Sequence, residues 1–163
     1  MPSQGDLGRS LLIKAENTKL FTGFGSDGDK FDLGDVELTL GKTRLNWATI
    51  SMVSMNGNGF DPVAVGSQGK PIRILVAATG LMQNTGMTLE HLPGNRVTYG
   101  SRAGSEPVLC EGIPFTLQFT KARGLRCFPL DESGNRRAEI RTEGNIVHLS
   151  PEYQTLWYEI EVF

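Results

Sequence analysis

The sequence alternates apolar and polar residues with a period of two in many short stretches, and glycine-rich turns separate these stretches. In one of them Val36, Leu38 and Leu40 share one face while polar side chains occupy the other. This period is typical of β-strands with one buried face, and almost no stretch shows the helical period of about 3.6 residues. A nearly continuous apolar run over residues 72–79 predicts a central strand that is covered on both faces.

About ten stretches have the composition and length of strands. They are residues 11–15, 19–24, 36–40, 47–55, 72–79, 115–120, 125–130, 136–142, 146–149 and 155–162. Their number and spacing predict an all-β fold, an antiparallel two-sheet β-sandwich that is jelly-roll-like. Residues 84–106 have only weak periodicity and predict a long, partly ordered loop, a kind of segment that is often functional.

The length of 163 residues suits one domain, expected over residues 10–163, with residues 1–9 as a flexible leader or cloning remnant. The formal net charge of −2 provides no basic footprint for nucleic acid. No apolar run approaches the roughly 18 residues that span a membrane, so no membrane partner is expected. The first residues lack the basic and apolar regions of a signal peptide. The chain is therefore either cytoplasmic or a module of a longer exported protein.

Nothing in the sequence indicates catalysis, and the chain is not expected to be an enzyme. Neither His91 nor His148 lies near a nucleophile motif, and His148 falls in an expected strand, where a structural role is typical. Cys110 and Cys127 lack the paired spacing of a zinc site. A bridge between them would close a loop of about 17 residues, but two cysteines form no disulfide framework and free buried thiols are expected.

One glycine-rich segment, residues 27–35, concentrates acidic side chains, among them Asp27, Asp29 and Asp32. Carboxylate oxygens are the ligands that calcium prefers. The segment is not an EF-hand loop, because Phe31 occupies the third ligand position. Two interpretations stay open: a solvated acidic turn, or a structural calcium site. No other cofactor is expected.

Tryptophan is the most informative residue type in this chain. In the last expected strand Trp157 shares a polar face with Glu159, and Trp47 shares a face with polar side chains of an earlier strand. An indole on a polar face can stack on a sugar ring while its neighbours bond the hydroxyls. Tyr99 and Tyr153, near expected loops, are further candidate contacts. The alternative is that both indoles pack under loops or a second sheet.

Several stretches also carry a family resemblance. They cover residues 47–57, 72–80, 83–87, 107–113, 130–137 and 150–160, with Asn84-Thr85-Gly86-Met87 and Leu156-Trp157-Tyr158-Glu159 as the most specific parts. In this order they resemble the β-sandwich accessory domain near the C-terminus of large bacterial glycoside-hydrolase-like proteins, those with a barrel catalytic domain. The resemblance covers roughly residues 18–162. In that family a tryptophan follows the Asn-Thr-Gly-Met stretch, whereas here Tyr99 is the aromatic side chain of the segment.

The resemblance implies a non-catalytic module of an exported carbohydrate-active enzyme, located outside the cell or in the periplasm. The first interpretation is a carbohydrate-binding module that holds the attached catalytic domain on a polysaccharide, a plant cell-wall β-glycan. A structural sandwich that packs on the catalytic barrel without binding sugar is the second. A small jelly-roll glycan lyase or hydrolase is the third.

Overall fold

The computed structural model describes residues 10–63, 70–94 and 96–163, and it shows an all-β chain with antiparallel sheets. The described residues form fourteen strands, more than the ten or so expected. They contain one short helical element, the 3₁₀ turn η1 (Pro151–Tyr153), and no helix long and apolar enough to cross a membrane. The expected leader, residues 1–9, lies outside the described residues.

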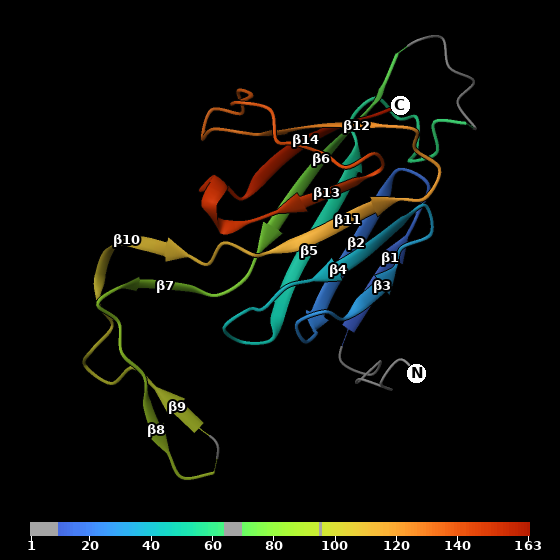
Figure 1. The fold of residues 1–163 in the computed structure, drawn as a ribbon. Coiled ribbons are helices and arrows are strands. Elements are labelled where there is room, and N and C mark those ends of the chain that lie inside the picture. The colour runs from blue at the N-terminus through green and yellow to red at the C-terminus, as the bar shows by residue number, and fades with distance from the viewer. Residues whose placement is uncertain (1–9, 64–69, 95) are drawn as a thin grey trace.

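Two sheets form the body of the molecule and lie as two layers (Figure 1). The larger sheet contains, in spatial order, β1 (Ser10–Lys14), β2 (Thr18–Phe24), β5 (Trp47–Ser54), β6 (Ile72–Thr79), β14 (Trp157–Val162) and β12 (Leu125–Pro129). The smaller sheet contains β13 (Ile146–Leu149), β11 (Phe115–Phe119), β4 (Val36–Leu40) and β3 (Lys30–Asp32). We call the side of the larger sheet that faces away from the smaller one its outer face.

The core lies between the two layers, as expected from the alternation. Phe21 and Ile160 of the larger sheet and Leu117 and Phe119 of the smaller one are completely buried in a single cluster. Each such side chain contributes about 1.5–3 kcal/mol when it is fully removed from water. The burial therefore accounts for the period of two in both sheets.

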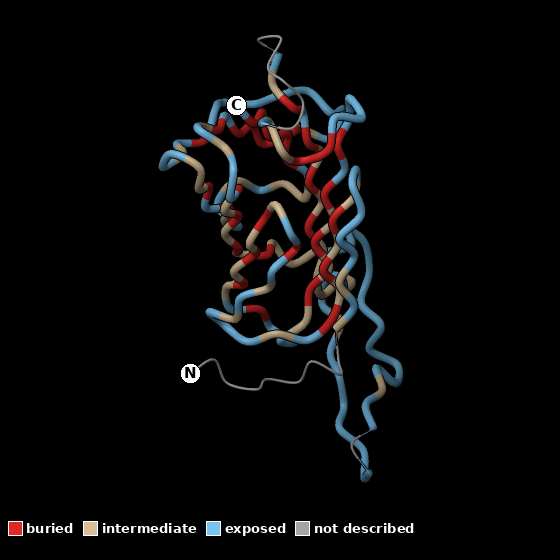
Figure 2. The backbone as a smooth tube through the Cα atoms, turned by 90° about the vertical axis from the view of Figure 1, so that its right-hand side faces the viewer, coloured by how far each residue is buried: buried red, intermediate tan, exposed pale blue. Residues whose placement is uncertain are grey.

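The remaining four strands lie outside the two layers, in an arm formed by residues 82–110. Near the sandwich β7 (Met82–Thr85) pairs with β10 (Ser105–Cys110), and farther out β8 (Glu90–Leu92) pairs with β9 (Arg96–Thr98). Figure 2 shows the arm projecting from the layers and exposed along nearly its whole length. The prediction of a long, partly ordered loop over residues 84–106 was wrong for these short strand pairs, and the other described residues of the segment form turns and loops. Because both faces of these strands are exposed, they carry no apolar alternation for a sequence pattern to detect.

Two further differences have local causes. Residues 136–142 form no strand, only isolated bridges from Arg136 to Leu130 and from Ile140 to Cys127. This segment runs beside β12, where the Arg137 and Ile140 N–H groups donate to the Pro129 and Cys127 carbonyls, and the Arg136 side chain extends over the outer face, as described below. The short β3 was not expected, since three residues are too few to show a period. The turn expected at residues 131–135 is confirmed: the Asp131 carboxylate accepts hydrogen bonds from the backbone of Ser133 and Asn135.

Candidate functional site

Both tryptophans lie on the outer face of the larger sheet. Trp47 is the first residue of β5 and Trp157 is the first residue of β14, with β6 between the two strands. Their chain neighbours Ala48 and Tyr158 are buried in the core, so strand alternation directs both indoles outward. Trp157 is 43% exposed and Trp47 is half-buried.

The strand register sets the separation of the two indoles. Trp157 lies opposite Ala77 of β6, which lies opposite Ser51 of β5, and Trp47 precedes Ser51 by four residues. Strands about 4.8 Å apart with a rise of about 3.3 Å per residue place the two Cα atoms roughly 16 Å apart. No single sugar ring can contact both indoles, so only an extended ligand can use both.

Thr79 of β6 lies between the strands that carry the two indoles, in a row of threonines that continues onto β5 and β2. Thr22, Thr49 and Thr79 are cross-strand partners on β2, β5 and β6, and all three are half-buried. The hydroxyl oxygens of Thr22 and Thr49 are 2.6 Å apart and share a hydrogen bond. Phe24 lies directly opposite Trp47 and is 47% exposed. We did not identify Phe24 from the sequence, although it occupies the same alternating face as Thr22.

Glu159, expected among the binding residues, is engaged inside the protein. Its Oε1 accepts hydrogen bonds from Arg73 Nε and Arg136 Nη2, both at 2.6 Å, and its side chain is 6% exposed. These bonds, the one from Arg136 first, lower the pKa of Glu159 to about 2. Arg136 also bonds Glu161 at 2.6 Å, and its guanidinium lies over the Phe128 ring. This network holds the segment that follows the 131–135 turn against the outer face.

The two candidate tyrosines do not join the tryptophans. Tyr99 is exposed on the arm, just beyond β9. Tyr153 lies in η1 and packs partly buried against the core, its ring edge-on to Tyr158 with centroids 6.4 Å apart. Of the five side chains expected to bind sugar, the structure therefore brings only Trp47 and Trp157 together on one open face.

The candidate calcium ligands make local contacts. Asp29 accepts a hydrogen bond from the Ser26 backbone, and Asp32 accepts bonds from the Gly34 backbone and from Lys14 Nζ. The Gly34 bond is the main reason that the pKa of Asp32 is lowered. Among the residues that the structure describes, no three His, Cys, Asp or Glu side chains group closely enough to hold a metal ion. Calcium binding at Asp27, Asp29 and Asp32 stays a prediction, which melting temperatures in calcium and in chelator would test.

Both cysteines are free thiols, but only one is buried as expected. Burial in the core raises the pKa of Cys127 to about 12, whereas Cys110 is half-buried at the root of the arm. His148 lies exposed on β13, and its Nδ1 is 2.9 Å from the Thr116 hydroxyl. His91 is exposed on β8.

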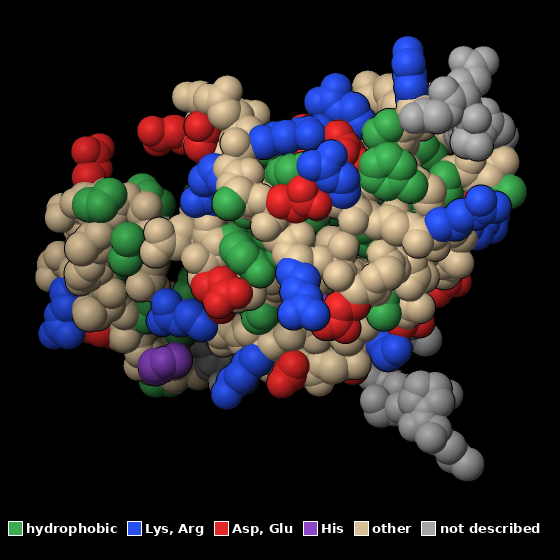
Figure 3. Space-filling view, turned by 45° about the horizontal axis from the view of Figure 1, so that its top comes forward, with side chains coloured by type: hydrophobic (Ala, Val, Ile, Leu, Met, Phe, Trp, Pro, Cys, Tyr) green, Lys and Arg blue, Asp and Glu red, His purple; other side chains and the backbone are tan. Residues whose placement is uncertain are grey.

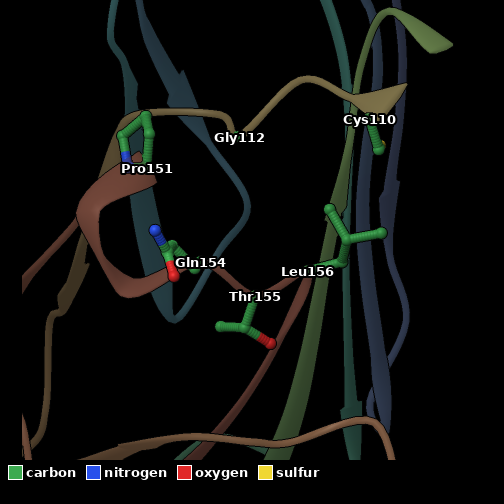
Figure 4. A pocket seen from close by; sticks show the side chains of 6 residues that line it. All are labelled: Cys110, Gly112, Pro151, Gln154, Thr155 and Leu156. Carbon is green, nitrogen blue, oxygen red and sulfur yellow. The ribbon is translucent and has the colours of Figure 1, made fainter. Parts of the chain in front are cut away.

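A pocket of about 350 Å³ lies at the root of the arm, and its lining is mostly apolar (Figure 4). Cys110 and Leu156 lie on one side of it, and Pro151 and Gln154 of the η1 region lie on the other. Gln154 caps η1 in a left-handed conformation with φ of 48°. The pocket contains no indole of the outer face and is a separate feature.

Comparisons with protein-family models, with curated proteins and with solved structures find no match for this chain.

Proposed function

We propose that this chain is a non-catalytic carbohydrate-binding module that holds a β-glycan across the outer face of its larger sheet. The observation that carries the proposal is the placement of Trp47 and Trp157 on one open face with Thr79 on the strand between theirs. Indoles stack on the apolar faces of sugar rings, and neighbouring polar groups bond the hydroxyls. The separation of the indoles suits a stretch of polysaccharide better than a single sugar.

The rigidity of the sheet supports this role. Trp157 is fixed at the end of a ladder with β6, and its backbone N–H donates to the Thr155 hydroxyl at 3.1 Å. Binding groups on paired strands lose little conformational freedom when a ligand arrives, which lowers the entropic cost of association. In this proposal the binding face is one surface of a jelly-roll-like sandwich, the fold expected from the sequence. With the family resemblance, the proposal assigns the module to a longer exported protein that degrades polysaccharide.

The test is affinity electrophoresis of the chain through gels containing soluble β-glucan, β-mannan or xylan. We expect retardation by at least one of them. Trp157→Ala should weaken binding several-fold, because aromatic contacts contribute about 0.5–1.5 kcal/mol beyond area burial. Phe163→Ala is the matched control: Phe163 is 44% exposed just beyond the other end of β14, and its removal should leave binding unchanged.

Thermal unfolding of both variants separates loss of contact from loss of fold. Trp157→Ala should melt close to the parent, since the indole is only partly covered. A parent chain that no glycan retards would overturn the proposal, and so would equal retardation of the parent and Trp157→Ala.

The same face favours a second candidate, a structural module that packs on a catalytic barrel. Leu11, Ile13 and Val53 are apolar and from 37% to 56% exposed on the outer face. Exposed apolar patches mark surfaces that other protein covers. The candidate predicts that Ile13→Glu releases a separately expressed catalytic domain while the parent shows no glycan retardation. The first candidate predicts the reverse pattern.

A further inference from the structure

Thr79 lies midway between the two indoles of the outer face. It is paired with Thr49 of β5, and Trp47 precedes Thr49 by two residues. On the other side Trp157 is paired with Ala77, which precedes Thr79 by two residues. Strand spacing and rise place the Cα atom of each tryptophan about 8 Å from that of Thr79, on one diagonal line across β5, β6 and β14. We call this line the diagonal path, and a ligand that contacts both indoles must follow it over Thr79.

The hydroxyl of Thr79 is available to a ligand. The neighbouring hydroxyls of Thr22 and Thr49 are bonded to each other, with their oxygens 2.6 Å apart. Among the residues that the structure describes, the Thr79 hydroxyl has no hydrogen-bond partner. It also reaches solvent, because every fully buried side-chain nitrogen or oxygen of those residues has a partner. A ligand can therefore bond this hydroxyl without breaking a hydrogen bond inside the protein.

The backbone holds Thr79 in a fixed place on this face. Besides its pairing with Thr49 on one side, the adjacent Ala78 N–H donates to the Leu156 carbonyl at 2.9 Å on the other. Threonine is branched at Cβ, so its side chain has few rotamers within a strand. The hydroxyl is thus presented in a limited range of directions, which lowers the entropic cost of bonding a ligand.

The diagonal path carries no charge. The outer-face positions of β5 and β6 that lie between the two indoles are Thr49, Ser51, Ala77 and Thr79. Glu159, the charged side chain next to Trp157 on this face, is bonded to Arg73 and Arg136. Elsewhere on the sandwich acidic and basic side chains are interspersed, as Figure 3 shows for one side of the molecule. A glycan with a carboxylate on each sugar would find no cationic partner along the diagonal path.

We propose, on the basis of the function proposed above, that the outer face binds a neutral, extended glycan along the diagonal path, and that Thr79 is its specificity-determining residue. Two sugars stack on Trp47 and Trp157, and the Thr79 hydroxyl bonds a hydroxyl of a sugar between them. Indoles stack on the apolar faces of many kinds of sugar ring, so they contribute affinity with little selectivity. A hydroxyl on a strand bonds only a sugar hydroxyl that is directed toward it, and it therefore selects among neutral glycans.

Removal of one hydroxyl tests the role of Thr79. Calorimetric titration with cellohexaose, mannohexaose and xylohexaose measures the affinity of each variant. Thr79→Val keeps the shape of the side chain and should weaken binding of the preferred hexasaccharide about three- to tenfold, the contribution of one hydrogen bond. Thr79→Ser keeps the hydroxyl and should retain the affinity of the parent. Both variants should melt at the temperature of the parent, because no hydrogen bond inside the protein is lost.

Thr18→Val is the matched control. Thr18 is half-buried on the outer face of β2, opposite Val53, and it lies off the diagonal path. The same chemical change on the same face should leave hexasaccharide binding unchanged. A difference between the two valine variants therefore reports the position of the hydroxyl and not a general change of the sheet.

The parent chain tests the extent and the charge of the ligand. In titrations from the disaccharide to the hexasaccharide of the preferred glycan, affinity should rise until the ligand reaches both indoles and should then stay constant. Polygalacturonate, an acidic polysaccharide, should not retard the chain in a gel at a concentration at which the preferred neutral glycan does.

The outcomes separate this assignment from the proposed function. Binding that Trp157→Ala weakens and Thr79→Val leaves unchanged would overturn the role of Thr79 and leave the sugar face intact. A disaccharide bound as tightly as the hexasaccharide would overturn the extended ligand, and equal retardation by polygalacturonate would overturn its neutrality. A parent chain that binds none of these glycans would overturn the proposed function and this assignment together.

Discussion

The sandwich and the arm are both built from short antiparallel strands, but they differ in what covers them. In β11 every second residue is buried, and Leu117 is 0% exposed. In β10, a strand of similar length, no residue is buried and Leu109 is 48% exposed. The strands of both regions are thus hydrogen-bonded to neighbours, but only the sandwich buries its side chains. The comparison separates the hydrogen-bonded ladder, which forms a strand, from the second layer, which stabilises it.

The largest expected effect comes from the same truncation made in both regions. Leu117→Ala should lower the free energy of unfolding by about 2–5 kcal/mol, because it removes buried methyl groups and leaves a cavity. Leu109→Ala should change it by no more than about 0.5 kcal/mol, as for other exposed positions. Urea unfolding measures the free energy of unfolding of both variants. Equal losses in the two variants would mean that the arm is part of the cooperative core.

A smaller effect on stability is expected from Glu159, where the segment that follows the 131–135 turn covers the outer face. The folded-state pKa of Glu159, about 2, lies below its ordinary value of 4.5, mainly because of the bonds from Arg136 and Arg73. Ionised Glu159 therefore stabilises the fold above pH 4.5, and this contribution disappears as the pH falls toward 2. It amounts to at most about 3 kcal/mol. Glu159→Gln should be less stable at neutral pH, and the gap to the parent should close in acid.

The exposed pair of Asp32 with Lys14 is the control for that experiment. Their side chains are 74% and 44% exposed, so Asp32→Asn should change stability by no more than about 0.5 kcal/mol. Denaturant midpoints measured from neutral pH down to about pH 3 compare the variants. If Glu159→Gln follows the parent at every pH, the network does not hold the covering segment.

The smallest expected effect is a difference in reactivity between the two thiols, one in the sandwich and one at the root of the arm. Cys127 is buried in the sandwich and burial raises its pKa to about 12, so it should not react with a thiol reagent in the native state. Cys110, half-buried at the root of the arm, should react. One thiol should titrate in the native protein and two in denaturant. Cys127→Ser should remove only the thiol that reacts in denaturant. Rapid reaction of both thiols in the native protein would contradict the burial of Cys127.

The predictions from sequence succeeded and failed for identifiable reasons. Residues 72–79 were assigned as a strand with their observed bounds, because a long apolar run has few alternatives. The expectation that this strand is covered on both faces was wrong: on the outer face Arg73 is exposed and Leu75 and Ala77 are only half-buried. Residues 136–142 were not a strand, because the segment meets β12 only at isolated bridges and forms no continuous ladder. Glu159 was placed on the correct face of its strand, but its two arginine partners come from distant residues. No local pattern indicates such partners.

The same division holds for the candidate site. Alternation within one strand was enough to place Trp157 on the side opposite Tyr158, and likewise Trp47 opposite Ala48, since successive side chains of a strand point to opposite faces. That the two indoles share one sheet follows only from the strand order, in which β6 separates β5 from β14.

The sequence by itself determined the all-β class, the turns and the face on which each alternating residue lies, because these depend on interactions between near neighbours in the chain. Only the tertiary structure decided which strands pair, that residues 82–110 leave the sandwich as an uncovered arm, and that the arginines close over Glu159. Those features depend on contacts between distant residues. Which of these contacts form is set by the packing of two layers together and not by any short stretch of sequence.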